Sequence, residues 1–242
     1  IAEQMSDLLG EALHISPADV VVASTGVIGQ TLDITPIANG IPALVAGLSK
    51  DGSLNAAHGI MTTDTKVKEI ALEFTVGGKT CRMGGIAKGS GMIHPNMATM
   101  LVFITTEGED FDAFMKALNT LTVYLCRCIA ADGEGATRLL ECEVKGGKDL
   151  ESARRITKSV ICSSLMKAAI FGADANWGRV LCAIGYSGVE TDVNGIDVVF
   201  SSRKGEILVC KDGAGVDFSE EIAKEILLED EITVKVTLSD GE

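Results

Sequence analysis

The sequence lacks the features that mark membrane proteins and nucleic-acid-binding proteins. No uninterrupted apolar stretch approaches the ~20 residues needed to span a bilayer. The first residues, IAEQMSDLLG, have no basic region followed by an apolar run, so no export signal is expected. Basic residues are the minority: 21 Lys and Arg stand against 34 Asp and Glu, and no basic run could follow a phosphate backbone. We expect a cytoplasmic globular protein with no membrane or nucleic-acid partner.

Motifs for metal and nucleotide binding are missing as well. The seven cysteines are spread along the chain, and the close pair Cys126 and Cys128 lacks both the C-x-x-C spacing and a second pair. We expect reduced thiols, mostly in the core, and no metal. The glycine-rich stretch 84–99, GGIAKGSGMIHPNMAT, matches no dinucleotide fingerprint or Walker loop, because Lys88 precedes the glycines that it would have to follow.

What the sequence does contain is a mixture of helical and strand periodicity. Apolar residues at helical spacing predict helices over 1–12, 36–48, 111–130, 150–170 and 219–228. Alternation predicts a hairpin within 67–86, a second pair of strands over 196–210 and a late strand over 232–238. Shorter apolar runs predict a strand at 20–22 and a buried strand at 100–104. Hairpins mixed with helices favour an α+β fold, and no linker is evident.

The glycine-rich stretch runs directly into the predicted buried strand, and Thr99 stands at the junction. A backbone that permits close approach, next to a buried strand, suits a reacting group. The residues alone favour a simpler interpretation, in which a glycine-rich turn enters a strand that begins with a β-branched residue.

Motifs elsewhere in the chain change this interpretation. The sequence resembles the ornithine acetyltransferase (glutamate N-acetyltransferase) family in five motifs that stand in the family's order: STGVIG at 24–29, HGIMTTDT at 58–65, GIAKGSGMIHPNMATML at 85–101, DGEGATR at 132–138 and FGADANWGR at 171–179. For the last motif the resemblance implies no chemical role, and a structural turn explains it equally well.

The resemblance implies layered sheets with packed helices, in a self-processing fold like that of the N-terminal-nucleophile enzymes. The precursor would cut itself between Ala98 and Thr99, giving an α-chain part, 1–98, and a β-chain part, 99–242. Thr99 would be the nucleophile. Its hydroxyl is weakly nucleophilic, and cleavage would expose an α-amine with an ordinary pKa of about 7.7–8.0 that can take the hydroxyl proton.

The resemblance also implies roles for other residues. Thr25 and Gly26 would form an oxyanion hole, donating hydrogen bonds from a hydroxyl and a backbone N–H. Lys88 can pair with the α-carboxylate shared by ornithine and glutamate, and Glu134 can pair with an ammonium group. Without the resemblance, these residues indicate only a turn after a strand and solvated surface charges. The complete substrate-binding set implied by the family is Thr62, Lys88, Thr99 and Glu134.

The implied reaction is a ping-pong acetyl transfer in arginine biosynthesis. Thr99 attacks the acetyl carbonyl of N-acetylornithine, ornithine leaves, and glutamate takes the acetyl group from the acyl-threonine ester. No cofactor is implied, although some members of the family also accept acetyl-CoA as the donor. The α and β chains from one precursor are expected to assemble as a dimer of the two-chain unit.

The chain departs from the family pattern in three places. It begins inside the family sequence, ends before the family's carboxyl-terminal tail, and lacks a segment between Thr105 and Asp132. The join is predicted near 119–123, and a deletion there would displace Glu134. Two alternatives follow: a related self-processing aminopeptidase or amidohydrolase, in which water resolves the acyl-enzyme, and an inactive truncated member that serves in binding or assembly.

Overall fold

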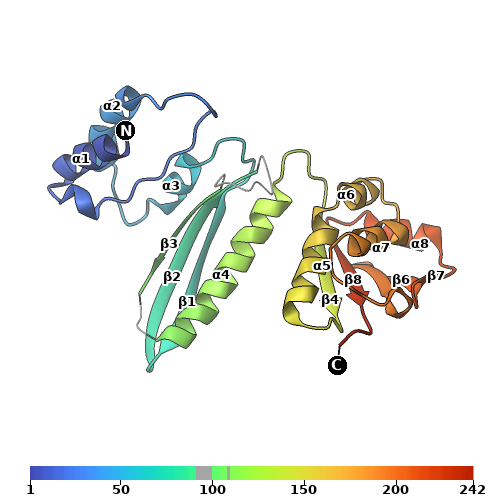
Figure 1. The fold of residues 1–242 in the computed structure, drawn as a ribbon. Coiled ribbons are helices and arrows are strands. Elements are labelled where there is room, and N and C mark those ends of the chain that lie inside the picture. The colour runs from blue at the N-terminus through green and yellow to red at the C-terminus, as the bar shows by residue number, and fades with distance from the viewer. Residues whose placement is uncertain (91–99, 108–109, 242) are drawn as a thin grey trace. The chain divides into compact units, whose positions relative to one another are not determined.

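The structure is a computed structural model that describes residues 1–90, 100–107 and 110–241 (Figure 1). The chain divides into two compact units, Ile1–Glu134 and Gly135–Glu242. The division falls inside the DGEGATR motif, where the sequence showed no linker. This division between compact units is distinct from the predicted cleavage between Ala98 and Thr99, and those two residues lie outside the described residues. None of the helices in the described part of the chain has the length and apolar character that a bilayer crossing requires.

The first unit opens with helices, two of which the sequence predicted. They are α1 (Ala2–Leu13), the short 3-10 helix η1 (Pro17–Asp19), α2 (Ile34–Ala46) and α3 (Ser53–Gly59). Asp33 caps α2, since its carboxylate accepts a hydrogen bond from the backbone N–H of Thr35 at 2.9 Å. The strand predicted over 20–22 is wrong. These residues have no partner strand in the described part of the chain, and the side chain of Val21 is 91% exposed.

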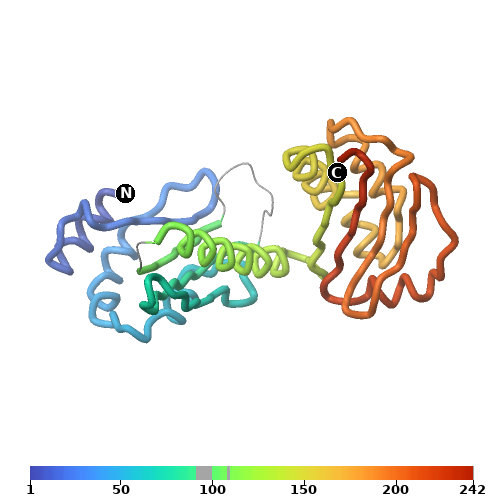
Figure 2. Tube along the Cα trace, turned by 90° about the horizontal axis from the view of Figure 1, so that it is seen from below, coloured from blue at the N-terminus to red at the C-terminus, as the bar shows by residue number. Residues whose placement is uncertain are grey.

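A three-stranded antiparallel sheet forms the centre of the first unit. Its strands are β1 (Lys68–Val76), β2 (Lys79–Lys88) and β3 (Leu101–Thr106), in the order β1-β2-β3. Gly77 and Gly78 close the predicted hairpin with φ values of +55° and +81°, which suit glycine in a two-residue turn. Helix α4 (Phe111–Ala131) runs along β1 and β2 (Figures 1 and 2). Its apolar stripe packs against Met83 and Ala87, which confirms the helix predicted over 111–130.

Strand β3 was predicted to be buried, and this prediction is wrong. It lies at the edge of the sheet, where the side chains of Val102 and Ile104 are 46% and 36% exposed. Their register partners, Ala87 and Gly85, lie on the same face and are buried. The difference arises because α4 packs chiefly on β1 and β2 and leaves much of β3 uncovered.

The second unit packs helices against one face of a five-stranded sheet (Figure 2). The sheet order is β4-β8-β5-β6-β7, with β4 and β8 parallel and the other pairs antiparallel. Strand β8 buries alternate residues, as the sequence predicted for 232–238. The elements are β4 (Leu139–Lys145), α5 (Leu150–Cys162), α6 (Ser164–Phe171), α7 (Trp177–Gly185), η2 (Val193–Gly195), β5 (Asp197–Ser202), β6 (Gly205–Lys211), β7 (Ala214–Gly215), α8 (Glu220–Leu227) and β8 (Glu231–Thr237).

The single helix predicted over 150–170 is two helices. Ser163 interrupts it with an extended backbone, and its hydroxyl accepts a hydrogen bond from the N–H of Met166 at 3.2 Å, which caps α6. Helix α8 begins after Ser219, whose hydroxyl caps it by accepting a hydrogen bond from the N–H of Ile222 at 3.3 Å. Both units mix helices with largely antiparallel sheets, which confirms the α+β class.

The predicted burial of the cysteines holds only in part. Cys81 and Cys210 are buried, whereas Cys126 and Cys182 are exposed. The apolar periodicity around Cys126 belongs to other faces of α4, since the buried stripe of that helix runs through Leu121 and Leu125.

Candidate active site in the first unit

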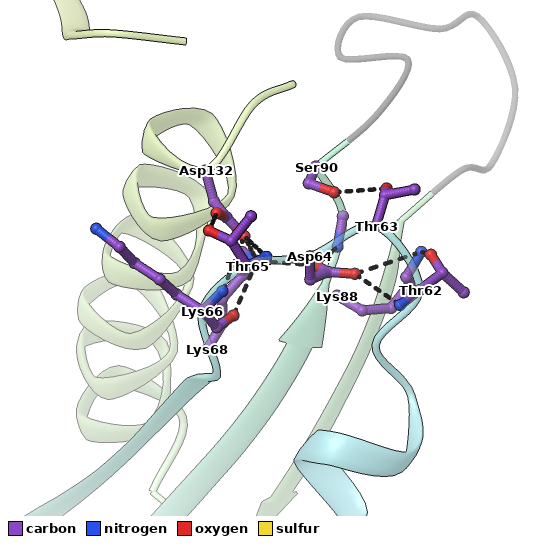
Figure 3. Close-up of polar contacts among 10 residues, drawn as sticks. Thr62, Thr63, Asp64, Thr65, Lys66, Lys68, Lys88, Ser90 and Asp132 are labelled. Atoms are coloured by element: carbon purple, nitrogen blue, oxygen red, sulfur yellow. Dashed lines mark hydrogen bonds and ion pairs between the residues drawn. The ribbon is translucent and has the colours of Figure 1, made fainter. Parts of the chain in front are cut away.

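The first unit buries four charged side chains where β1 begins and β2 ends (Figure 3). The exposed fractions are 1% for Lys68, 5% for Lys88, 8% for Asp64 and 7% for Asp132. They come from three segments: the connection between α3 and β1 together with the start of β1, the end of β2, and the residue after α4. Two cations and two anions balance one another, which is the condition under which charges are tolerated in an interior.

Lys68 joins the two carboxylates. Its ammonium group donates to Asp64 Oδ1 at 2.8 Å, to Asp132 Oδ2 at 2.5 Å and to the backbone carbonyl of Lys66 at 3.2 Å. Burial lowers the pKa of Lys68, but its bonds to Asp132 and Asp64 outweigh burial and raise this pKa above its ordinary value. Lys68 is therefore a permanent cation with an acceptor for each of its three protons.

Asp64 hydrogen-bonds two segments that were predicted to contribute to the site, one containing Thr62 and the other containing Lys88 and Gly89. Its Oδ1 accepts from the N–H of Gly89 at 2.7 Å, and its Oδ2 accepts from the N–H of Thr62 at 3.1 Å. The Lys88 ammonium lies 3.7 Å from the same Oδ2. Burial raises the pKa of Asp64, but the bonds from Gly89, Lys68 and Thr62 outweigh it, and the net pKa lies well below the ordinary value. The carboxylate stays ionised.

Asp132 ties the end of α4 to the same place. Its carboxylate accepts from the N–H groups of Thr65 at 3.0 Å and Lys66 at 3.4 Å, and it also hydrogen-bonds the Thr65 hydroxyl. Burial raises the pKa of Asp132, but the hydrogen bonds from Lys68 and Thr65 outweigh burial, and the net pKa lies below the ordinary value.

The structure brings together two of the predicted substrate-binding residues. The ammonium of Lys88 donates to the hydroxyl of Thr62 at 2.7 Å. Lys88 is almost fully buried, whereas Thr62 is an exposed residue, so a buried cation is hydrogen-bonded to the side chain of a surface residue. This arrangement can present positive charge to an anionic group that binds beside Thr62.

Glu134 lies next to this pair through its backbone. Its N–H donates to the carbonyl of Ser90 at 2.8 Å, and the Ser90 and Thr63 hydroxyls are 2.7 Å apart. Ser90 is 1% exposed, while Glu134 is exposed. The backbone of Glu134 therefore lies beside the end of β2, and its side chain faces solvent.

The other predicted catalytic residues are placed differently. Thr25 and Gly26 lie in an exposed segment between η1 and α2, and a Cβ atom on Gly26 would meet no atom within 4 Å. Within the described residues, no hydrogen bond joins Thr25 or Gly26 to Thr62 or Lys88. Ala98 and Thr99 lie outside the described residues. Met100, which follows Thr99 in the sequence, lies against Gly89: a Cβ atom on that glycine would come within 3.0 Å of Met100 Cγ.

Sequence reasoning missed the residues beneath the site. Asp64 and Asp132 stand inside recognised motifs, yet no role was given to them. Lys68 carried a readable signal, because it is in phase with Ile70 and Leu72 on the inward face of β1. A lysine at a position that alternation marks as buried requires partners.

The FGADANWGR motif, in the second unit, forms a structural turn. The carbonyl oxygen of the Asn176 side chain accepts from the N–H of Arg179 at 3.1 Å and caps α7, and its amide donates to Asp174 at 3.0 Å. The Trp177 ring occupies the space where a Cβ atom on Gly215 would lie. Of the two interpretations left open for this motif, these contacts favour the turn.

Comparison with known proteins identifies the family. The ArgJ family matches residues 1–109 and 106–242, so the chain belongs to the ArgJ family. The chain is similar to "Arginine biosynthesis bifunctional protein ArgJ" of Caldanaerobacter subterraneus, with 40% identity over 292 residues that cover 100% of this chain and 72% of that protein. It is also similar to "Glutamate N-acetyltransferase" of Methanocaldococcus jannaschii, with 40% identity over 296 residues, 100% of this chain and 73% of that protein. The first relative is named for arginine biosynthesis and the second for an acetyltransferase activity, and this chain is an enzyme of their family.

A solved structure supports the fold. The crystal structure of the arginine biosynthesis bifunctional protein ArgJ from Bacillus halodurans matches with a TM-score of 0.52 and 42% sequence identity. The match covers 56% of this chain and 62% of that chain, so the chain accounts for less than two thirds of that solved protein.

The comparisons also locate the missing segment. The alignment with the Caldanaerobacter protein runs over 292 residues and includes all 242 residues of this chain, so 50 of its positions have no counterpart here. The two stretches matched by the family meet at residues 106–109, between β3 and α4. The join predicted near 119–123 is wrong, because these residues lie inside the continuous helix α4.

Proposed function

We propose that this protein is a glutamate N-acetyltransferase that moves the acetyl group of N-acetylornithine to glutamate. The observation that carries the proposal is the hydrogen bond of 2.7 Å between the buried Lys88 ammonium and the exposed Thr62 hydroxyl. Both substrates carry an α-carboxylate, and a desolvated ammonium beside a hydroxyl is suited to binding one. The names of the relatives support the same activity.

In this proposal Thr99 is the nucleophile, made available by self-cleavage between Ala98 and Thr99. The hydroxyl oxygen attacks the acetyl carbonyl, and the free α-amine of Thr99 takes the hydroxyl proton. The intermediate then collapses, so that its C–N bond breaks and ornithine leaves with a proton. The amine of glutamate attacks the acyl ester in the second half-reaction and restores the hydroxyl.

Thr25 and Gly26 are proposed to donate hydrogen bonds to the oxyanion of the intermediate, and Glu134 to bind a substrate ammonium group. The exposure of Thr25 and Glu134 leaves their side chains free to contact a ligand. Loss of one oxyanion donor costs about 10²–10³ in kcat. We therefore expect Thr25→Ala to lower kcat by this factor with little change in the free energy of unfolding.

The proposal requires no cofactor. It includes assembly of the 1–98 and 99–242 chains as a dimer of the two-chain unit, and a cytoplasmic location with the other enzymes of the pathway. Acetyl-CoA as an additional donor is a separate part of the proposal, and the same transfer assay with acetyl-CoA in place of N-acetylornithine tests it.

Two measurements test the proposal together. Intact-mass spectrometry should find two fragments that meet at the Ala98–Thr99 bond in the wild-type protein and one chain in Thr99→Ala. An assay of N-acetylglutamate formation should show transfer in the wild type and in the control Thr75→Ala, an exposed threonine of β1, and none in Thr99→Ala. A single chain in both proteins would exclude self-cleavage.

The same assay distinguishes the alternatives. Release of acetate from N-acetylornithine in the absence of glutamate would identify a hydrolase, whereas strict dependence on glutamate excludes it. A folded, uncleaved protein that shows neither reaction would be an inactive family member, as the 50 missing positions allow.

A further inference from the structure

The three proposed substrate-binding residues outside the cleavage site are all attached to one buried set of charges. We call Lys68, Asp64 and Asp132 the Lys68 bridge. Thr62 donates its backbone N–H to Asp64, Lys88 forms an ion pair with Asp64, and Glu134 follows Asp132 by two residues. The side chains of the bridge are between 0% and 3% exposed, so they cannot contact a ligand at the surface themselves.

Stability alone does not explain such a bridge. Removing two ions from water costs several kcal/mol, and well-packed apolar residues in the same place are often as stabilising or more so. An apolar core is close at hand, because Met83 and Ala87 on the same sheet are packed against α4. Charged side chains differ from apolar ones because their hydrogen bonds are directional, so that each bond defines where its donor and acceptor lie.

The hydrogen bonds of the Lys68 bridge position the segments that form the proposed site. Asp64 uses one oxygen for Gly89 and Lys68 and the other for Thr62 and Lys88. It thereby sets the end of β2 against the segment that carries Thr62. The hydroxyl bond between Thr62 and Lys88 depends on both of these positions.

Asp132 performs the same task for the third segment. Its Oδ2 atom accepts from the Lys68 ammonium and from the backbone N–H groups of Thr65 and Lys66, and its Oδ1 atom accepts from the Thr65 hydroxyl. The chain then continues to Glu134, whose N–H bonds the Ser90 carbonyl at 2.8 Å. Lys68 is the one described residue that contacts both carboxylates through its side chain.

We propose that Lys68 is a positioning residue of this enzyme, which holds Thr62, Lys88 and Glu134 in the geometry that binds substrate by bridging Asp64 and Asp132. The inference deepens the proposed function and rests on it for the identity of the substrate. Lys68 itself touches no reacting atom.

The test removes the bridge and keeps the charges balanced. Lys68→Met/Asp132→Asn deletes one cation and one anion and leaves Lys88 paired with Asp64. We expect this variant to give the far-UV circular dichroism of the wild type, while the KM for N-acetylornithine rises about tenfold or more and kcat/KM falls about 10²-fold, because misplacement by about 1 Å has that effect. The control Lys79→Met removes an exposed lysine of the same sheet and should leave both constants unchanged.

A second readout needs no substrate. A small activated ester acylates lysines, and peptide mass spectrometry identifies the modified positions. The acylation rate of each lysine reports how far its amine is buried and hydrogen-bonded. Lys88 should be nearly inert in the wild type, because it is buried and bonded to Thr62, and should react at least about tenfold faster in the double variant. Lys79 provides the internal reference in both proteins.

The outcomes separate the two proposals. A folded double variant with wild-type KM and wild-type Lys88 acylation overturns the positioning role. Absence of transfer by the wild-type enzyme overturns the proposed function alone, and Lys88 acylation still decides the role of Lys68. If the double variant does not fold, Thr65→Val removes one hydrogen bond to Asp132 from an exposed residue. It should then raise KM and Lys88 acylation about fivefold, and no change would count against the proposal.

Discussion

Replacement of Lys68 alone should destabilise the first unit strongly and in a pH-dependent way. In Lys68→Met the carboxylates of Asp64 and Asp132 lose their shared cation while remaining buried. Lys88 lies 3.7 Å from Asp64 and is the nearest remaining cation in the described structure, so Asp132 is left without one. Breaking a buried ion pair by removal of one partner costs about 3–5 kcal/mol. We expect the free energy of unfolding to fall by this amount at pH 8.

The sign of the pH dependence follows from the pKa directions. In the wild type the pKa values of Asp64 and Asp132 are lowered, so their contribution is complete above the unfolded value of about 3.9 and is lost only as the pH falls through the lower folded values. The pKa of Lys68 is raised, so its contribution is complete below about 10.4 and is lost as the pH rises through the higher folded value. Between about pH 5 and pH 10 the wild-type bridge therefore contributes a constant amount.

The variant should behave in the opposite way at acidic pH. Without Lys68, we expect burial to become the dominant influence on the carboxyl group of Asp132 and to raise its folded pKa above the unfolded value. Proton uptake then stabilises the folded variant as the pH falls from 8 to 5. The loss of unfolding free energy should therefore be smaller at pH 5 than at pH 8.

Urea unfolding at pH 5 and pH 8, followed by far-UV circular dichroism, measures both quantities. Trp177 is the chain's single tryptophan and lies in the second unit, so its fluorescence follows that unit separately and should not change. Lys79→Met provides the control for the loss of a lysine. A loss below about 1 kcal/mol at pH 8, or a loss that grows toward pH 5, would refute the electrostatic reasoning.

Further predictions concern packing, thiol reactivity and helix capping. Gly85→Ala would place a Cβ atom 3.0 Å from Leu121 Cδ2 and should lower the unfolding free energy by about 1–3 kcal/mol. Leu121→Ala alone should lower it by about 2–5 kcal/mol. The double variant should lose measurably less than the sum of the two single losses, because the two residues are in contact. Cys142 is partly buried, and this burial, aided by the charge of Glu143, raises the pKa of its thiol to about 12. Iodoacetamide at pH 8 should therefore alkylate Cys142 about 10³-fold more slowly than exposed Cys126, as measured by peptide mapping, and equal rates would contradict the raised pKa. Asn176→Ala removes the cap of α7 and should cost about 1 kcal/mol in the second unit's unfolding followed by tryptophan fluorescence, while an unchanged midpoint would exclude the cap.

The elements that were predicted correctly each have a periodic apolar face that packs against one neighbouring layer of the structure. The 67–86 hairpin, the helix over 111–130 and the late strand over 232–238 each show an apolar face in the sequence and bury that face in the structure. The failures have a different origin. Residues 20–22 are β-branched but pair with no strand among the residues that the structure describes, and α4 leaves the apolar side chains of β3 largely uncovered. Propensity is local, whereas pairing and burial depend on residues far away in the sequence.

The family and the α+β class can be read from the sequence alone, and the site residues are predicted from it, because motifs such as HGIMTTDT and DGEGATR are runs of neighbouring residues that can be recognised without a fold. The hydrogen bond between Lys88 and Thr62 and the bridge that Lys68 forms between Asp64 and Asp132 follow from tertiary packing. Lys68 and Asp132 are separated by 64 positions, and their contact exists only where the start of β1 lies beside the end of α4. A buried charge can be anticipated from a lysine in phase with apolar residues, but its partners are chosen by packing.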